Sequence, residues 1–151
     1  KNFGLYRERT GALTVVADNA EQAATVMSQV KLRIRYNYSN PPSDGGQIVA
    51  TVLSDKQLRA QWIEEVADIR NRINEMRHVL VKTLKEKGLK QDFSPIIEQC
   101  GMFSVTRLTK EQVAELREKF SIYIVDSGRI NVAGLTRDNM DRLCEALKEV
   151  L

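Results

Sequence analysis

The chain has 151 residues, which is long enough to bury a hydrophobic core and is the length of one ordinary domain. Hydrophobic residues make up 42% of it and charged residues 28%, a balance that indicates a globular protein and argues against disorder. The net charge of +3 is too small to indicate nucleic-acid binding by itself. Apolar runs span only a few residues, so we expect no transmembrane helix and no signal peptide after Lys1.

The cysteines and the single histidine do not have the spacing of a metal site. Cys100 and Cys144 lie far apart, and His78 cannot complete a zinc site with them on sequence grounds. We therefore predict no bound metal. Both cysteines are interpreted as reduced thiols of a cytoplasmic protein.

The first part of the chain predicts a buried strand followed by helices. Residues 11–17 read GALTVVA, an apolar and β-branched run that is typical of a strand. Asp18 or Asn19 can cap a helix over residues 20–36. The sequence NYSNPPSDGG then forbids regular structure, because it contains two prolines and two glycines. A short apolar helix is expected over residues 47–53.

The longest periodic segment predicts one amphipathic helix that connects two lobes. Its apolar residues recur at steps of three and four: Leu58, Trp62, Val66, Ile69, Ile73, Met76, Leu80 and Leu84. Ser54 with Gln57 has the pattern of a capping box, and Gly88 is a natural residue to follow the last turn. At 1.5 Å per residue, such a helix spans roughly 45 Å.

The remaining residues predict a small α+β unit. Residues 102–107 alternate in polarity, and Thr109 begins a helix with a capping pattern. Residues 121–125 and 129–132 read as a pair of strands around a turn. Thr136 caps a last helix that runs to the end of the chain.

Three arginines stand where the backbone is constrained. Arg9 directly precedes Thr10-Gly11, Arg35 ends a helix before NYSNPP, and Arg129 follows Ser127-Gly128. A guanidinium presents a planar fork that suits phosphate and carboxylate groups. Each of these arginines alone is more often an ordinary surface residue, so the pattern leaves both readings open. The stretch KLRIRYNY is favoured as a solvated helix face over a nucleic-acid surface.

Four motifs, in order along the chain, resemble those of the aspartate and aromatic amino acid aminotransferases. KNFGLYRERTGAL is similar to the segment that carries the family's pyridoxal phosphate lysine. RYNYSNPPSDGGQIVATVL is similar to the family pattern R-x-N-Y-S-N-P-P-x-x-G. GMFS and, further on, SGRINVAGL complete the order. The resemblance extends over essentially the whole chain but covers only the C-terminal portion of such enzymes.

This resemblance implies an α/β fold of fold type I. Residues 1–54 would form the end of the large cofactor-binding domain, residues 55–88 the long connecting helix, and residues 89–151 a small α+β C-terminal domain. The first half of the large domain would precede Lys1, so the strand over residues 11–17 would lack its sheet partners. For the same reason, we expect the isolated segment to be catalytically inactive.

The resemblance implies that pyridoxal 5′-phosphate is bound by Lys1 and Arg9. Lys1 would hold this cofactor as a Schiff base and then act as the general base and acid of the proton transfer. Arg9 would bind the cofactor phosphate. The implied reaction is transamination between aspartate, or an aromatic amino acid, and 2-oxoglutarate.

The resemblance also implies a substrate site shared by two subunits of a homodimer. Arg129 would bind the α-carboxylate, and Arg35 would reach the neighbouring subunit's site to bind the distal carboxylate of a dicarboxylic substrate. Phe103 would line the pocket, and Ser39 would lie nearby. The alternative is a catalytically inactive segment that acts only as a binding or interaction module. Neither reading calls for a nucleic-acid or membrane partner.

Overall fold

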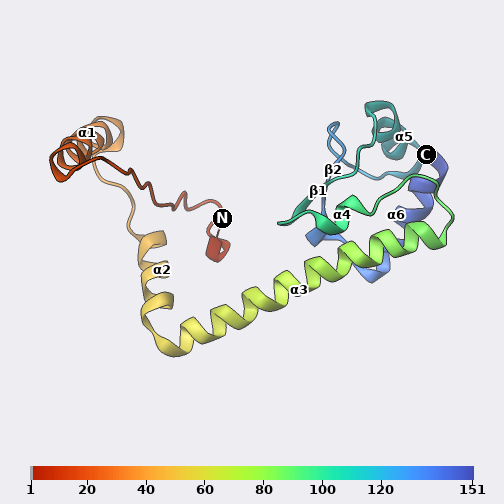
Figure 1. Ribbon diagram of the computed structural model, residues 1–151, viewed down its shortest axis with the longest axis horizontal. Helices are drawn as coiled ribbons and strands as arrows, with labels where there is room; N and C mark the ends of the chain where they lie inside the picture. The colour runs from red at the N-terminus through yellow and green to blue at the C-terminus, as the bar shows by residue number, and fades with distance from the viewer. Residues whose placement is uncertain (1) are drawn as a thin grey trace. The chain divides into compact units, whose positions relative to one another are not determined.

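The computed structural model describes residues 2–151, and its backbone contacts divide into two compact units. The first unit comprises Lys1–Ile63 and the second Glu64–Leu151. The division falls inside helix α3, Lys56–Glu86, which is one continuous helix of 31 residues (Figure 1). The domain boundaries expected from the resemblance, after residues 54 and 88, stay a prediction.

The first unit contains a short 3₁₀ turn and two helices before α3. The turn η1 is Asn2–Gly4, α1 is Ala20–Tyr38 and α2 is Asp44–Ser54. Asn19 is the residue that caps α1, because its side-chain oxygen accepts a hydrogen bond of 2.9 Å from the Gln22 backbone N–H. Both expected helices are therefore present, and each is slightly longer than the apolar pattern indicated.

The prediction of a strand over residues 11–17 is wrong, because the structure has no strand there. These residues are extended without regular structure, and the side chains of Leu13 and Val16 are 78% and 93% exposed. An isolated strand leaves its backbone groups without ladder partners, and none of the residues that the structure describes pairs with this segment.

Helix α3 begins one residue later than the capping pattern predicted. Ser54 is the last residue of α2, and the cap is Asp55. The Asp55 Oδ1 accepts hydrogen bonds from the backbone N–H groups of Gln57 and Leu58, at 2.8 and 2.9 Å. At the other end, Gly88 adopts a φ of +78°, as expected of a residue that terminates a helix.

The second unit packs helices against a two-stranded sheet. Its elements after α3 are α4 (Pro95–Glu98), β1 (Phe103–Val105), α5 (Lys110–Phe120), β2 (Arg129–Asn131), η2 (Val132–Gly134) and α6 (Arg137–Val150). The expected capping residues Thr109 and Thr136 are confirmed. Each forms a reciprocal capping box with the residue three positions later, Gln112 and Asn139 respectively.

The predicted pairing of residues 121–125 with residues 129–132 is also wrong. Strand β2 instead pairs antiparallel with β1, with Phe103 opposite Asn131 and Val105 opposite Arg129. Residues 121–125 are irregular and begin at Ser121, whose φ of 53° ends α5 in a left-handed turn. Alternating Ile122 and Ile124 are half-buried against the core, so the apolar pattern reports burial rather than strand pairing.

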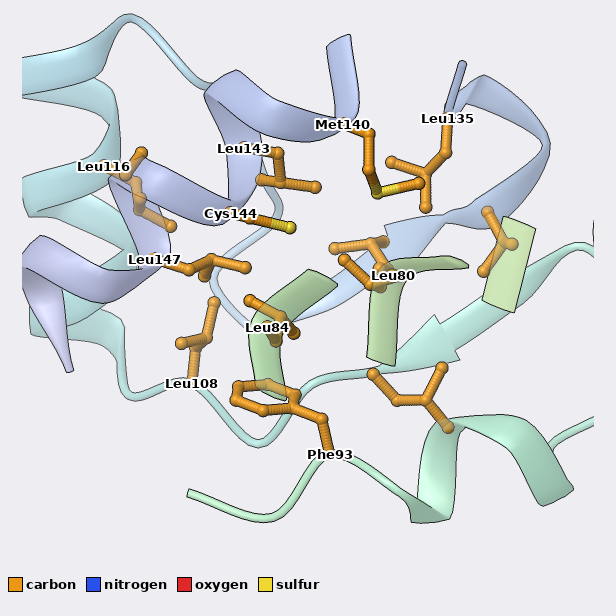
Figure 2. Close-up of a cluster of buried hydrophobic side chains, with 14 of the residues drawn as sticks. Leu80, Leu84, Phe93, Leu108, Leu116, Leu135, Met140, Leu143, Cys144 and Leu147 are labelled. Atoms are coloured by element: carbon orange, nitrogen blue, oxygen red, sulfur yellow. The ribbon is translucent and has the colours of Figure 1, made fainter. Parts of the chain in front are cut away.

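One hydrophobic core holds the second unit together. Figure 2 shows Leu80 and Leu84 of α3 facing Leu143 and Leu147 of α6. Cys144 lies among them, fully buried, and both cysteines are free thiols. Burial raises the pKa of the Cys144 thiol from 9.0 to about 11, because a thiolate would be poorly solvated there.

An ion-pair cluster joins the end of α3 to α6. The Lys87 ammonium lies 2.6 Å from an Asp141 oxygen and also bonds Glu145. These two hydrogen bonds, with Asp141 contributing most, raise the pKa of Lys87.

Among the residues described here, no helix combines the length and apolarity needed to cross a membrane.

Truncating Leu84 is expected to have a large effect on stability, because this core residue is only 1% exposed. We expect Leu84→Ala to lower the free energy of unfolding by about 2–5 kcal/mol, because it leaves a cavity among tightly packed neighbours. Urea unfolding followed by circular dichroism measures this change. Leu151→Ala is the matched control, because Leu151 is 41% exposed and its truncation should cost about 0.5 kcal/mol or less. Equal losses for both variants would contradict the assigned core.

Candidate functional site

The six residues predicted for the site fall in different parts of the chain. Lys1 lies outside the described residues. Three residues belong to the first unit and two to the second: Arg9, Arg35 and Ser39, and then Phe103 and Arg129. The segment after Lys1 is held by an aromatic contact, in which the rings of Phe3 and Trp62 stack with centroids 4.8 Å apart and planes 2° from parallel.

Arg9 lies in a turn that packs on the start of α2. Its φ of 53° is left-handed, and its side chain is exposed. The adjacent Thr10 approaches Gly45 so closely that a Cβ on Gly45 would lie 1.8 Å from the Thr10 Oγ1. Only glycine therefore permits this contact, which fixes the turn that carries Arg9. The Arg9 guanidinium has no hydrogen-bond or ion-pair partner among the described residues, so its donors are available to an anion.

Arg35 and Ser39 are brought together at the end of α1. The Arg35 Nη1 donates a hydrogen bond of 2.7 Å to the Ser39 Oγ. Ser39 itself has φ 66° and ψ −66°, and the Asn40 N–H donates to the Tyr38 carbonyl at 2.8 Å across it. This is the rare and strained form of the γ-turn. Strain of this kind occurs where a chain must hold a particular geometry, and here it lies directly before the two prolines.

Phe103 and Arg129 are brought together on one face of the two-stranded sheet. In β1 and β2 the central residues Ser104 and Ile130 are buried, and the residues on either side point to the opposite, exposed face. On that face the Arg129 guanidinium carbon lies 4.7 Å from the centroid of the Phe103 ring, a cation–π contact. Within the described part of the chain, the Arg129 guanidinium has no hydrogen-bond or ion-pair partner.

A cavity of about 450 Å³ opens beside this pair. Its walls are Phe103 and Arg129, the irregular segment 121–125, and the α6 residues Asn139, Arg142 and Leu143. The lining is mostly apolar, with a guanidinium whose donors are unpaired at one wall. Such a cavity suits a small molecule that has a carboxylate and a short apolar part.

The α6 wall of this cavity could not be identified from the sequence. Asn139 and Arg142 are three residues apart and therefore share a helix face. That spacing is the only signal in the sequence, and it is equally common on any solvated helix. Arg142 also has a structural partner, because its Nη2 donates a hydrogen bond of 2.7 Å to the Phe120 carbonyl.

Comparisons with known proteins identify the family of the chain. Residues 1–147 match the model of the family described as aminotransferase class I and II. The chain is 60% identical to the aspartate aminotransferase of Haemophilus influenzae and 58% identical to that of Escherichia coli, over all of its 151 residues. It is 45% identical to the aromatic-amino-acid aminotransferase of Escherichia coli. In each case the chain spans 38% of the length of the relative.

Solved structures of such enzymes share the fold. The aromatic-amino-acid aminotransferase of Burkholderia pseudomallei, covalently bound to pyridoxal phosphate, has a TM-score of 0.94 and 51% identity, over 99% of this chain and 37% of that one. The mitochondrial aspartate aminotransferase of Trypanosoma brucei also gives 0.94, at 43% identity over 99% of this chain and 39% of that one. The expected fold class, part of an α/β fold of type I, is confirmed. By its sequence and its fold, the chain belongs to the class I and II aminotransferases.

Proposed function

We propose that the protein containing this chain transfers an amino group between aspartate, or an aromatic amino acid, and 2-oxoglutarate. The observation that carries the proposal is Arg129, whose unpaired guanidinium lies against Phe103 at the wall of the 450 Å³ cavity. Every amino acid and every 2-oxo acid has a carboxylate beside its reacting carbon, and a bidentate guanidinium binds such a group. The relatives named aspartate and aromatic-amino-acid aminotransferases support this reading.

The residues present fit pyridoxal 5′-phosphate as the cofactor. The cofactor has an aldehyde and a phosphate, which require a primary amine and an anion-binding group. Lys1 would supply the amine and Arg9 the phosphate ligand, and Arg9 has donors available for it. When bound, the cofactor supplies the electron sink that makes the α-hydrogen of an amino acid acidic. The relative from Burkholderia pseudomallei, which has pyridoxal phosphate bound covalently, supports the assignment.

Lys1 would also transfer the proton. Its Nζ must be neutral to accept the hydrogen of the substrate Cα, which the deprotonated amine can do as a general base. Arg129 would hold the α-carboxylate as a bidentate pair and thereby restrict the orientation of the substrate. Phe103 would cover one face of the guanidinium and restrict its rotation.

Arg35 would select the second carboxylate of aspartate and 2-oxoglutarate. The Ser39 hydroxyl accepts one of its hydrogen bonds, and the remaining donors of the guanidinium are available to a carboxylate. We propose that Arg35 acts in the site of the neighbouring subunit of a cytoplasmic homodimer. The strained γ-turn at Ser39 would hold the end of α1 in the geometry that this contact needs.

The direct test is an assay of the full-length protein that carries this chain. Purified protein with added pyridoxal phosphate is expected to convert aspartate and 2-oxoglutarate to oxaloacetate and glutamate. The products are measured by chromatography. The same assay with phenylalanine in place of aspartate determines the preference for aspartate or aromatic substrates. Failure to transfer an amino group from either donor would defeat the proposed function.

A further inference from the structure

Arg77 is a charged residue in the core of the second unit. It lies on α3 between Met76 and Leu80, and only 1% of it is exposed. Its Nη2 is shared by three oxygen atoms: the carbonyls of Gly101 and Phe103, at 2.7 and 3.2 Å, and the Ser104 Oγ, at 3.2 Å. All three acceptors belong to the segment that forms β1 and the turn before it.

The register of the sheet explains why the Phe103 carbonyl needs this donor. The Val132 N–H bonds the Met102 carbonyl at 2.8 Å, and the Thr106 N–H bonds the Gly128 carbonyl at 3.0 Å. In an antiparallel ladder, hydrogen-bonded pairs alternate with pairs that are not. Phe103, opposite Asn131, therefore occupies a pair that is not hydrogen-bonded, and its carbonyl points away from β2. Arg77 supplies the partner that β2 cannot.

This bond connects the core to the exposed face of the sheet, on which Phe103 and Arg129 lie. Ser104 points inward, where its hydroxyl meets Arg77, and the neighbouring Phe103 points outward, where its ring meets Arg129. Arg77 therefore holds the backbone of the residue that packs on the Arg129 guanidinium. A shift of β1 would move the Phe103 ring and release that guanidinium.

The cost of burying Arg77 argues against a role in stability alone. Among the described residues its Nε and Nη1 have no hydrogen-bond partner, and no carboxylate forms an ion pair with it. A buried cation without a counter-ion is unfavourable, and apolar residues of similar volume often replace buried charges without loss of stability. The charged guanidinium instead donates hydrogen bonds to the three oxygen atoms of the β1 segment.

We propose that Arg77 is a positioning residue for substrate binding: by fixing the Gly101–Ser104 backbone from the core, it holds Phe103 against Arg129 and orients that guanidinium for a carboxylate. The inference rests on the proposed function, in which Arg129 binds the carboxylate beside the reacting carbon. It differs from that function because Arg77 itself touches neither substrate nor cofactor.

The test measures the affinity of the full-length protein for succinate, which is aspartate without its amino group and cannot react. Isothermal titration calorimetry gives this affinity independently of turnover. We expect Arg77→Met to weaken succinate binding about tenfold, because Arg129 loses its orientation. The Michaelis constant for aspartate should rise similarly, with a smaller change in kcat. Arg70→Met is the matched control on the same helix, because Arg70 is exposed, and it should leave succinate affinity unchanged.

A double-mutant cycle separates positioning from general destabilisation. Arg129→Lys keeps a charge for the carboxylate but lacks the planar fork, so Phe103 has no guanidinium to orient. In the Arg129→Lys background, we expect Arg77→Met to change succinate affinity less than about twofold. If the two residues acted independently, Arg77→Met would weaken succinate binding about tenfold in this background as well. If Arg77→Met does not fold, Arg77→Lys is measured in the same cycle, and its smaller loss should also vanish with Arg129→Lys.

The outcomes distinguish this inference from the proposed function. Multiplicative losses in the cycle, or unchanged affinity in a folded Arg77→Met protein, would overturn the role of Arg77. A wild-type protein that binds succinate but transfers no amino group would defeat the proposed reaction. The double-mutant cycle of succinate affinities would still decide the role of Arg77. A wild-type protein that binds no succinate would defeat both.

Discussion

Replacing Lys1 by alanine in the full-length protein is expected to abolish amino transfer. The change removes the amine that would carry the cofactor and the base that would take the proton from the substrate Cα. Loss of general-base catalysis alone lowers a rate by roughly 100- to 10,000-fold. Loss of the covalent attachment adds to this. Initial rates with aspartate and 2-oxoglutarate measure the effect, and cofactor retained after dialysis measures the attachment.

Two variants control for charge and for general damage. Lys1→Arg keeps a positive charge, but its guanidinium remains protonated and is a poor nucleophile, so we expect nearly the same loss as with alanine. Lys31→Ala removes an exposed lysine of α1 and should leave the rate unchanged. Wild-type turnover by Lys1→Ala would show that another residue performs both tasks, and the assignment of Lys1 would be wrong.

The helices could be predicted from the sequence because their signals are local. Thr109 and Thr136 each precede a residue that completes a capping box three positions later, and the structure confirms both. The apolar stripe identified the buried face of α3 only in its second half, because Leu80 and Leu84 are buried whereas Ile69, in the same stripe, is 60% exposed. Ser54 failed as a cap because Asp55, directly after it, offers a better-placed oxygen to the same turn.

The strand expected over residues 129–132 is present as β2, Arg129–Asn131. The pairing of strands could not be predicted in the same way, because it depends on distant residues. Residues 11–17 have a strand sequence but no partner within the described chain. Residues 121–125 have alternating burial, yet β1 takes the place beside β2. Strand propensity reports that a segment fits a half-buried surface, and it does not identify the neighbour.

The candidate site shows the same division between local and distant information. The motifs pointed to Phe103 and Arg129 separately, and only the register of β1 and β2 places the ring against the guanidinium. Arg77 shows the limit most clearly. It lies four residues after Ile73 and three before Leu80, on the buried face, but a charged side chain at such a position gives no signal in an apolar pattern.

The second large effect separates the two substrate arginines. We expect Arg129→Ala to lower kcat/KM for every amino-acid substrate, because all of them have the α-carboxylate. Arg35→Ala should lower kcat/KM for aspartate and glutamate and leave kcat/KM for phenylalanine nearly unchanged, because only the first two substrates have a distal carboxylate. Loss of one partner of a desolvated charged pair costs about 2–5 kcal/mol. That corresponds to a decrease in kcat/KM of roughly 30-fold to several thousand-fold. Equal losses for aspartate and phenylalanine in Arg35→Ala would contradict its selective role.

Mixed dimers test whether Arg35 acts across the subunit interface. A dimer of one Lys1→Ala subunit and one Arg35→Ala subunit has two possible sites. If Arg35 serves the neighbouring subunit, the site with an intact Lys1 receives Arg35 from the Lys1→Ala subunit, so one complete site forms. Tandem affinity tags isolate this heterodimer, which should then show about half of the wild-type activity toward aspartate. If Arg35 served its own subunit, each site would lack one of the two residues, and the heterodimer would be no more active than the Arg35→Ala homodimer.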